Sequence, residues 1–361
     1  MYGISISSSG HGPERFDRMV ALAREAESAG FDTVWTSELY NRSATIPMAV
    51  LAQGTESVRI GCNIGYGVGR TPLIWAAEAR DLDELSAGRV IIGLGNGTPG
   101  MMENWHGVSG ATPAVRMEEL VEVLRKLWRL HEGPVHHEGP FYRVHVVPTS
   151  DTAPPAQEHL PIWTAGVNPR MIRAAGRVAD GLVGHPMFTP SYVDGVVRPA
   201  LEAGARSVGR DVKEVTVMGI LMCAVDDDVE AARRRIAYAI SQYAASRVYD
   251  RLFEMHGWRD AQLEIRAAAK RRDVDALVRA VPEEAIDAIA VACRPEELAE
   301  RVAAHTATYD HLDLVAPAWG LSPSETEDAT RRIVNGIRPL GPSPTDHLSR
   351  HTTDDLARST T

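Results

Sequence analysis

Several apolar runs of the sequence end in polar residues that could bind a ligand or move a proton. Glu38 follows the run 33–36, where a carboxylate can hold a ring N–H or take part in proton transfer. His106 and His185 lie in predicted loops, and imidazole readily exchanges protons near neutral pH. Each residue also has a plainer interpretation, because a loop glutamate or histidine is more often a solvated surface residue. The pattern indicates a candidate site built from the ends of successive strands.

The segment 165–170, Ala-Gly-Val-Asn-Pro-Arg, has the features of a phosphate site. Asn168 can be the N-cap of a helix and Pro169 its first residue, because proline needs no N–H partner there. The first turn then presents free N–H groups to an anion, and Arg170 adds positive charge. An ordinary capped helix with surface arginines is the alternative. The residues expected to contact a phosphate-bearing ligand are Ala165, Gly166, Val167, Asn168 and Arg170.

Two glycine-containing loops follow the apolar runs 58–61 and 90–94. Glycine lets the backbone approach a flat ligand closely. The second loop contains Asn96, but its glycine spacing differs from a Rossmann fingerprint and no acidic partner is evident. A structural bulge with a buried thiol is the equally weighted alternative for the first loop. The candidate ligand-binding residues of that first loop are Cys62, Asn63 and Ile64.

The elements that must position these residues alternate between short apolar strands and amphipathic helices, which implies a parallel sheet. About eight such strands over residues 1–340 predict an α/β fold, a (β/α)8 barrel, whose catalytic residues lie at the carboxyl ends of the strands. Two insertions interrupt the pattern. The first, 100–160 after the fourth strand, is expected over the mouth of the sheet, and the second, 247–280, follows the seventh strand. A polar tail, 341–361, is expected to be poorly ordered.

Composition excludes several classes of function. With 361 residues, a formal net charge of −10 and 44% hydrophobic residues, the chain resembles an ordinary globular protein and does not favour a nucleic-acid partner. Three dispersed cysteines fit a reducing, cytoplasmic setting. The first residues lack the pattern of a signal peptide and no stretch approaches about 18 apolar residues, so we expect neither a signal peptide nor a membrane segment. The adjacent His136 and His137 would point to opposite faces of a strand, so we expect no metal site.

Several of these segments together resemble the bacterial-luciferase-like family. The resemblance covers about residues 1–337. It rests on the following segments: Phe31-Asp32-Thr33-Val34-Trp35-Thr36-Ser37-Glu38, Arg70-Thr71-Pro72, Asp83-Glu84-Leu85-Ser86-Ala87-Gly88-Arg89 with Gly93-Leu94-Gly95-Asn96-Gly97, Pro161-Ile162-Trp163-Thr164-Ala165-Gly166 and Ala174-Ala175-Gly176-Arg177-Val178-Ala179-Asp180-Gly181.

The resemblance implies a barrel that binds a flavin or the deazaflavin coenzyme F420. Ser37-Glu38 and the segment 105–108 look most like the F420-dependent branch. There, a bulge after strand three, often with a non-proline cis peptide, backs the ring; by position this is Cys62-Asn63 or Asn63-Ile64. Loop 165–168 would hold the phosphate. Glu38 and Asn96 would face the ring or its side chain. Ser37 and His185 are also expected to contact the cofactor.

Two departures from the family pattern affect the expected catalytic residues. Leu39 stands where some members have a histidine after the acidic residue, so its role is empty or falls to Tyr40, His106 or His185. Asn168 replaces the usual glycine before Pro169. The tryptophans 35, 105, 163 and 319 fall near predicted strand ends and either line the site or pack in the core.

The leading hypothesis is an F420-dependent oxidoreductase that transfers a hydride between C5 of the deazaflavin and a small organic substrate. The alternative is a two-component FMN-dependent monooxygenase that uses reduced flavin from a separate reductase and O2. A non-catalytic flavin-binding or scaffold barrel is the third hypothesis. The family also implies a homodimer. The substrate would be selected by the two insertions.

Overall fold

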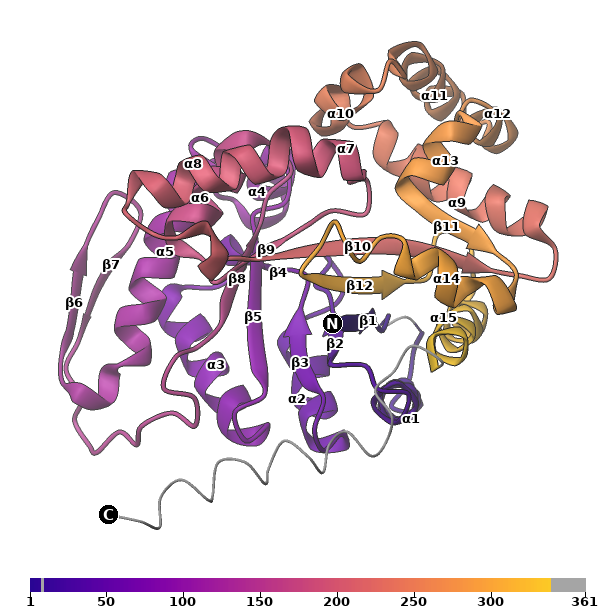
Figure 1. Cartoon of the computed structure of the whole chain (residues 1–361). Helices are drawn as coiled ribbons and strands as arrows, with labels where there is room; N and C mark the ends of the chain where they lie inside the picture. The colour runs from indigo at the N-terminus through magenta and orange to yellow at the C-terminus, as the bar shows by residue number, and fades with distance from the viewer. Residues whose placement is uncertain (8–9, 339–361) are drawn as a thin grey trace, which may run out of the picture.

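Parallel strands close into a barrel at the centre of the computed structural model, which describes residues 1–7 and 10–338 (Figure 1). Each strand of the ring pairs with the next, and the last pairs with the first. This confirms the predicted (β/α)8 barrel. In order around the ring, the strands are β1 (Tyr2–Ser5), β2 (Thr33–Thr36), β3 (Arg59–Cys62), β5 (Val90–Gly95), β8 (Ile162–Ala165), β9 (Gly181–Val183), β10 (Thr216–Val225) and β12 (His311–Val315).

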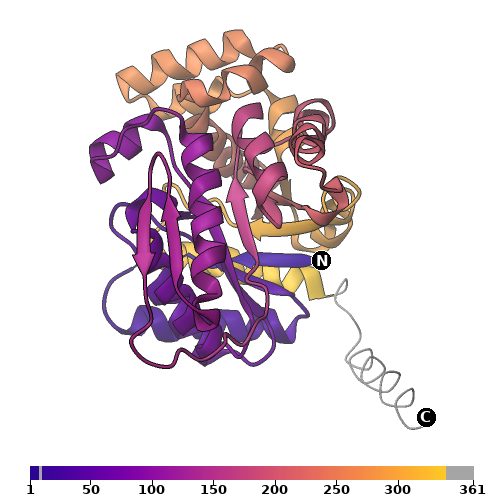
Figure 2. The same cartoon turned by 90° about the vertical axis from the view of Figure 1, so that its left-hand side faces the viewer.

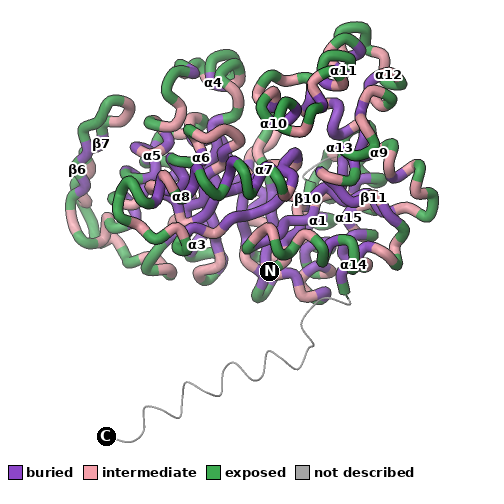
Figure 3. Tube along the Cα trace, turned by 45° about the horizontal axis from the view of Figure 1, so that its top comes forward, coloured by how far each residue is buried: buried purple, intermediate pink, exposed green. Residues whose placement is uncertain are grey.

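Amphipathic helices surround the ring, one after each strand. Their buried residues recur at helical spacing, as in Met19, Leu22, Ala23 and Ala26 of the first helix. Figure 3 shows the result: buried chain concentrates in the strands and on the helix faces toward them. The helices are α1 (Glu14–Ser28), α2 (Thr45–Gly54), α3 (Pro72–Leu85), α5 (Pro113–Trp128), α6 (Pro169–Val178), α8 (Arg198–Ser207), α9 (Val229–Ala244) and α15 (Pro323–Ile337).

Further helices and strands are added to this barrel. No helix in the described ranges could cross a bilayer. α4 and the α10–α12 segment stand at the end of the barrel reached by the carboxyl termini of the strands (Figure 1). These further elements are β4 (Gly65–Tyr66), α4 (Pro99–His106), β6 (Val135–Glu138), β7 (Arg143–Val146), α7 (Pro190–Tyr192), α10 (Asp250–Met255), α11 (Arg259–Arg271), α12 (Val274–Arg279), α13 (Glu283–Ile289), β11 (Ala290–Cys293) and α14 (Leu298–Ala303).

The elements differ from the sequence expectation in two places. The sequence predicts one helix over 282–292, but this helix ends at Ile289, because residues 290–293 pair with the last four residues of the long strand β10. The hairpin β6–β7, expected over the mouth, instead runs alongside α5 on the outside of the barrel (Figure 2). The predicted tail, 341–361, lies outside the described residues.

Glu119 of α5 anchors that hairpin. Its buried carboxylate accepts hydrogen bonds from the backbone N–H groups of Phe141 (3.0 Å) and Tyr142 (2.8 Å), and from His137 Nε2 (3.1 Å). These bonds and the buried Val135 and Val144 hold the strands against α5. This explains why the hairpin does not reach the mouth.

Glu119→Ala is therefore expected to destabilise the protein by about 2 kcal/mol, because it leaves buried hydrogen-bond donors without an acceptor. Limited proteolysis should show new cleavage within 135–146. The exposed Glu138→Ala serves as the control and should leave both stability and the cleavage pattern unchanged. Equal effects of the two variants would contradict the assignment.

Candidate active site

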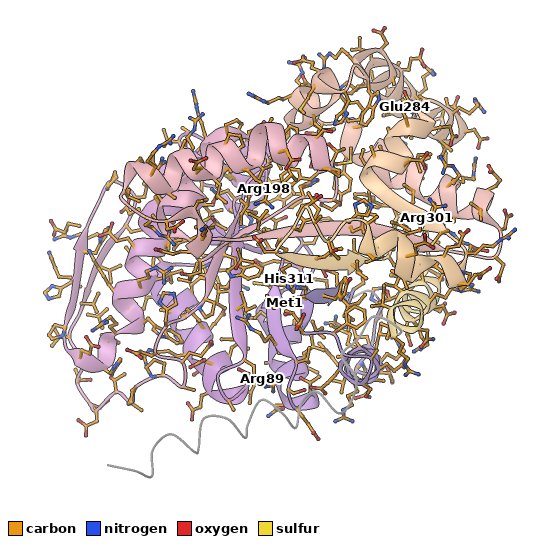
Figure 4. The ribbon with its side chains drawn as sticks, in the orientation of Figure 1. Met1, Arg89, Arg198, Glu284, Arg301 and His311 are labelled. Carbon is orange, nitrogen blue, oxygen red and sulfur yellow. The ribbon has the colours of Figure 1, made fainter. Side chains whose placement is uncertain are left out.

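Inside the barrel, aromatic side chains form a layer near the end at which the strands begin. Trp35 and Trp163 are buried, their ring centroids 5.2 Å apart, and Trp35 Nε1 donates to His311 Nε2 at 3.1 Å. Figure 4 places His311 beside Met1, at the start of β12. Glycines 3, 61 and 181 leave the space that these indole rings fill. These two tryptophans are thus core residues, whereas Trp105 and Trp319 are partly exposed.

Above this layer the interior becomes polar and partly exposed to solvent. Ile64, Ala165 and Ile220 pack on the aromatic cluster and remain only partly buried. Asn63 Nδ2 donates to Ser5 Oγ (2.9 Å) and to Asp313 Oδ2 (2.8 Å), and Ser5 Oγ donates to the same Asp313 oxygen (2.7 Å). The peptide Asn63–Ile64 is cis, one of the two positions that the resemblance indicated. A ligand entering at the strand ends would meet this triad.

Asp313 and His311 are buried ionisable groups on the same strand. Burial raises the pKa of Asp313 to about 8, against the opposing effect of hydrogen bonds from Ser5 and Asn63. Burial lowers the pKa of His311 to about 3, helped by the nearby N-terminus and Arg59. At pH 7 both side chains are therefore mainly neutral. Oδ1 of Asp313 has no hydrogen-bond partner among the described residues.

The Glu38 carboxylate is held in place by an ion pair and a backbone hydrogen bond. Arg70 makes a bidentate ion pair with its carboxylate (2.8 and 3.0 Å), and the backbone N–H of Tyr66 donates to it at 2.7 Å. Arg70 also pairs with Glu78 at 2.8 Å and lies 4.5 Å from the Trp75 ring centroid. Glu38 therefore joins the segment after β2 to β4 and to the turn that precedes α3. Its predicted role in proton transfer stays a prediction, and the geometry adds a positioning role.

The predicted catalytic residues Tyr40 and His106 belong to one aromatic cluster at the mouth. Tyr40 packs against Trp105, with centroids 5.5 Å apart, and Tyr66 packs against both Trp105 and His106. Tyr40 is 72% exposed, so its hydroxyl can meet a ligand only from the solvent side. His106 Nε2 is buried without a hydrogen-bond partner among the described residues. The catalytic roles predicted for these two residues stay predictions.

His185 lies in a second aromatic cluster, with Tyr243 and Tyr249. The N–H of Met187 donates to its Nδ1 (3.2 Å), which leaves Nε2 to donate to the Tyr249 hydroxyl (2.9 Å). Burial lowers the pKa of His185 to about 3. The ring is a neutral structural donor at pH 7. A neutral imidazole is a poor general acid at this pH, and the predicted contact of His185 with the cofactor stays a prediction.

The predicted phosphate loop begins α6 as expected. Asn168 is the N-cap and Pro169 the first helical residue, but the Asn168 amide donates to the carbonyl of Val248 (3.4 Å) instead of capping the helix. The backbone N–H groups of Arg170 and Met171 are consequently without partners among the described residues. Arg170 is exposed beside them. The geometry suits an anion.

Of the other predicted residues, Ser37 is exposed to solvent, whereas Asn96 and Cys62 are buried. Ser37 lies at the end of β2. Asn96 is 5% exposed and donates to the Pro113 carbonyl, and its Oδ1 has no hydrogen-bond partner within 1–7 and 10–338. Cys62 is fully buried, its thiol donating to the Gly93 carbonyl (3.1 Å), and burial raises its pKa to about 11. The thiol therefore serves the packing of β3 on β5, and the predicted ligand contact of Cys62 stays a prediction.

Sequence reasoning did not select Asp313, Ser5, Tyr66 or Arg70 for the site. The available signal for Asp313 was an acidic residue within the apolar run His311–Val315, where an unpaired charge is costly. No group of three or more metal-ligating side chains occurs within 1–7 and 10–338.

Comparison with known proteins agrees with this architecture. The family model described as luciferase-like monooxygenase matches residues 3–311. An uncharacterised protein of Mycobacterium tuberculosis is 32% identical over 289 residues, 77% of this chain and 84% of that protein. A second protein of that organism, provisionally named a coenzyme F420-dependent oxidoreductase, is 31% identical over 222 residues, 58% of this chain and 63% of that protein.

Solved structures share the fold. The coenzyme F420-dependent tetrahydromethanopterin reductase of Methanopyrus kandleri superposes with a TM-score of 0.77 at 23% identity, covering 94% of this chain and 99% of that one. The oxygenating constituent of 3,6-diketocamphane monooxygenase of Pseudomonas putida, in complex with FMN, gives 0.65 at 17% identity, covering 95% and 99%. The chain belongs to the luciferase-like monooxygenase family and is an oxidoreductase.

Proposed function

We propose that the protein is an F420-dependent oxidoreductase that transfers a hydride between the deazaflavin and a small organic substrate. The observation that carries the proposal is the uncapped N-terminus of α6, where two free N–H groups and Arg170 can bind a phosphate. The relative named for coenzyme F420 supports the deazaflavin over FMN. When bound, the deazaflavin supplies a carbon that accepts or gives a hydride.

The chain's own residues would orient the ring and shield it. Ile64, Ala165 and Ile220 offer an apolar surface above the aromatic layer. Asn96 Oδ1, His106 Nε2 and Asp313 Oδ1 are buried polar atoms without partners among the described residues, so the site has unused hydrogen-bonding capacity for a polar ring. α4 and the α10–α12 segment can exclude water from the mouth (Figure 1).

Arg170→Ala is expected to weaken the binding of F420 about tenfold, which corresponds to about 1.4 kcal/mol. The loss follows from removing a charged donor beside a phosphate. Fluorescence-quenching titration measures the dissociation constant. Arg206→Ala, in the last turn of α8, is the matched control and should change it less than twofold. Equal affinities for wild type and Arg170→Ala would remove the phosphate from this loop.

A two-component FMN-dependent monooxygenase is the second candidate, favoured by the structural likeness to the FMN-containing Pseudomonas protein. It would use the same phosphate loop, and a separate reductase would supply reduced flavin. Tight binding of reduced FMN without binding of F420 would replace the first proposal by this one.

A further inference from the structure

We propose that Asp313 is a further ligand-binding and proton-holding residue of the site, whose Oδ1–H group donates a hydrogen bond to an acceptor oxygen or nitrogen of the bound ring. The inference rests on the proposed function, because it places that ring in the upper part of the barrel interior. It assigns a role to a residue inside β12, which the rule that site residues follow the strand ends does not select.

The hydrogen bonds around Asp313 determine which oxygen carries the proton. Oδ2 receives two donors, Ser5 Oγ at 2.7 Å and Asn63 Nδ2 at 2.8 Å. Asn63 Nδ2 also donates to Ser5 Oγ at 2.9 Å, so the serine hydroxyl hydrogen is left to point at Asp313. The lone pairs of Oδ2 are then in use, and a proton on the carboxyl group belongs on Oδ1.

Oδ1 is the oxygen that lacks a partner. Asp313 is fully buried and its Oδ1 accepts and donates no hydrogen bond among the described residues. A buried hydroxyl donor without an acceptor is unfavourable, so a ligand acceptor placed there would gain a hydrogen bond. Ser5 and Asn63, the two residues that hold Asp313, are themselves partly exposed. The triad thus extends from the solvent-accessible strand ends to the buried carboxyl group.

In the part of the chain that the structure describes, no neighbouring charge keeps Asp313 ionised. On its own strand, His311 is neutral at pH 7, because burial lowers its pKa to about 3. On β10, burial raises the pKa of the Cys223 thiol well above its usual value. β1 and the end of β3 contribute the uncharged Ser5 and Asn63. Glu38, at the end of β2, is paired with Arg70, and Arg59 and the N-terminus lie at the amino ends of the strands.

The pH dependence follows with a definite sign. Burial raises the pKa of Asp313 to about 8, so the donor is present below that pH and is lost above it. Above pH 8 the ionised carboxylate would also repel an acceptor atom. The folded protein holds this proton when the unfolded chain has released it, so the free energy of unfolding should fall from about pH 4 to about pH 8.

The test compares wild type with Asp313→Asn. The asparagine carbonyl can accept from Ser5 and Asn63 while its NH2 group takes the place of Oδ1–H at every pH. Wild-type affinity for F420 should fall about tenfold between pH 7.5 and 9 relative to Asp313→Asn. The ratio of the two dissociation constants at each pH removes any titration of F420 itself. A ratio independent of pH would overturn the inference.

Two further measurements keep the outcome clear if Asp313→Asn fails to fold. Ser5→Ala removes a donor to Oδ2 and should shift the midpoint of the affinity change to higher pH; an unchanged midpoint would assign the titration to another group. The infrared carbonyl band of a protonated carboxyl group, followed against pH without ligand, should disappear near pH 8. If this band is absent at pH 6, the inference is contradicted, whichever cofactor the protein binds. A normal band with no F420 binding at any pH contradicts the proposed function instead.

Discussion

Arg70→Met is expected to lower the free energy of unfolding by about 3 kcal/mol, because it leaves two acidic side chains without their shared cation. The side chains of Arg70 and Glu38 are only 14% and 11% exposed, so solvent screens their ion pair weakly. Arg70 also bonds Glu78 and lies over Trp75, so one substitution removes three contacts. Denaturant unfolding measures the loss.

A surface ion pair supplies the matched control. Arg332→Met removes a pair with Asp227 at 3.8 Å, where both side chains are about half exposed or more. Such a pair is expected to contribute less than about 0.5 kcal/mol. The double variant Glu38→Gln/Arg70→Met should be less destabilised than the sum of its single variants, since their effects are coupled. Additive losses, or equal losses in Arg70→Met and Arg332→Met, would contradict the clamped arrangement of Glu38.

Gly93→Ala should have the largest effect on stability, a loss of about 4 kcal/mol or more, or failure to fold. A Cβ at this position would overlap the backbone carbonyl oxygen of Cys62, and a carbonyl in a paired strand cannot swing aside as a flexible side chain can. Soluble yield and denaturant unfolding check the prediction.

Gly100→Ala is the control for that substitution. A Cβ at Gly100 would have its nearest neighbours at 3.7 and 3.9 Å, which is ordinary contact within helix α4. We expect a change within about 0.5 kcal/mol, or slight stabilisation from the less flexible unfolded chain. Comparable stability of the two variants would show that β3 and β5 can separate locally.

The barrel could be predicted from the sequence because strand and helix periods alternate almost without interruption. Pro72 and Pro169 each mark the start of a helix, and the structure begins α3 and α6 at these residues. Residues 290–292 are predicted as helix but form a strand. Short apolar runs carry no clear period, and this strand pairing depends on the distant β10. The place of the hairpin depends on Glu119, whose partners lie up to 23 residues away.

The sequence predicts the candidate site only where polar residues or glycines directly follow the end of a strand. Glu38, Asn63 and the loop 165–168 satisfy that rule. Asp313 lies inside a strand, and its partners Ser5 and Asn63 are 308 and 250 residues distant, so no local pattern could join them. The glycines at 93 and 95 suggested a flat ligand, but their missing side chains make room for the Cys62 carbonyl and for Ile64.

Fluorescence-quenching titration of the full chain with coenzyme F420, and separately with oxidised and reduced FMN, tests the proposed function most directly. We expect micromolar or tighter binding of F420 and much weaker binding of both forms of FMN. Tight binding of reduced FMN with no response to F420 would contradict the account and identify a flavin monooxygenase. Binding of neither cofactor would contradict both proposals and favour a non-catalytic barrel.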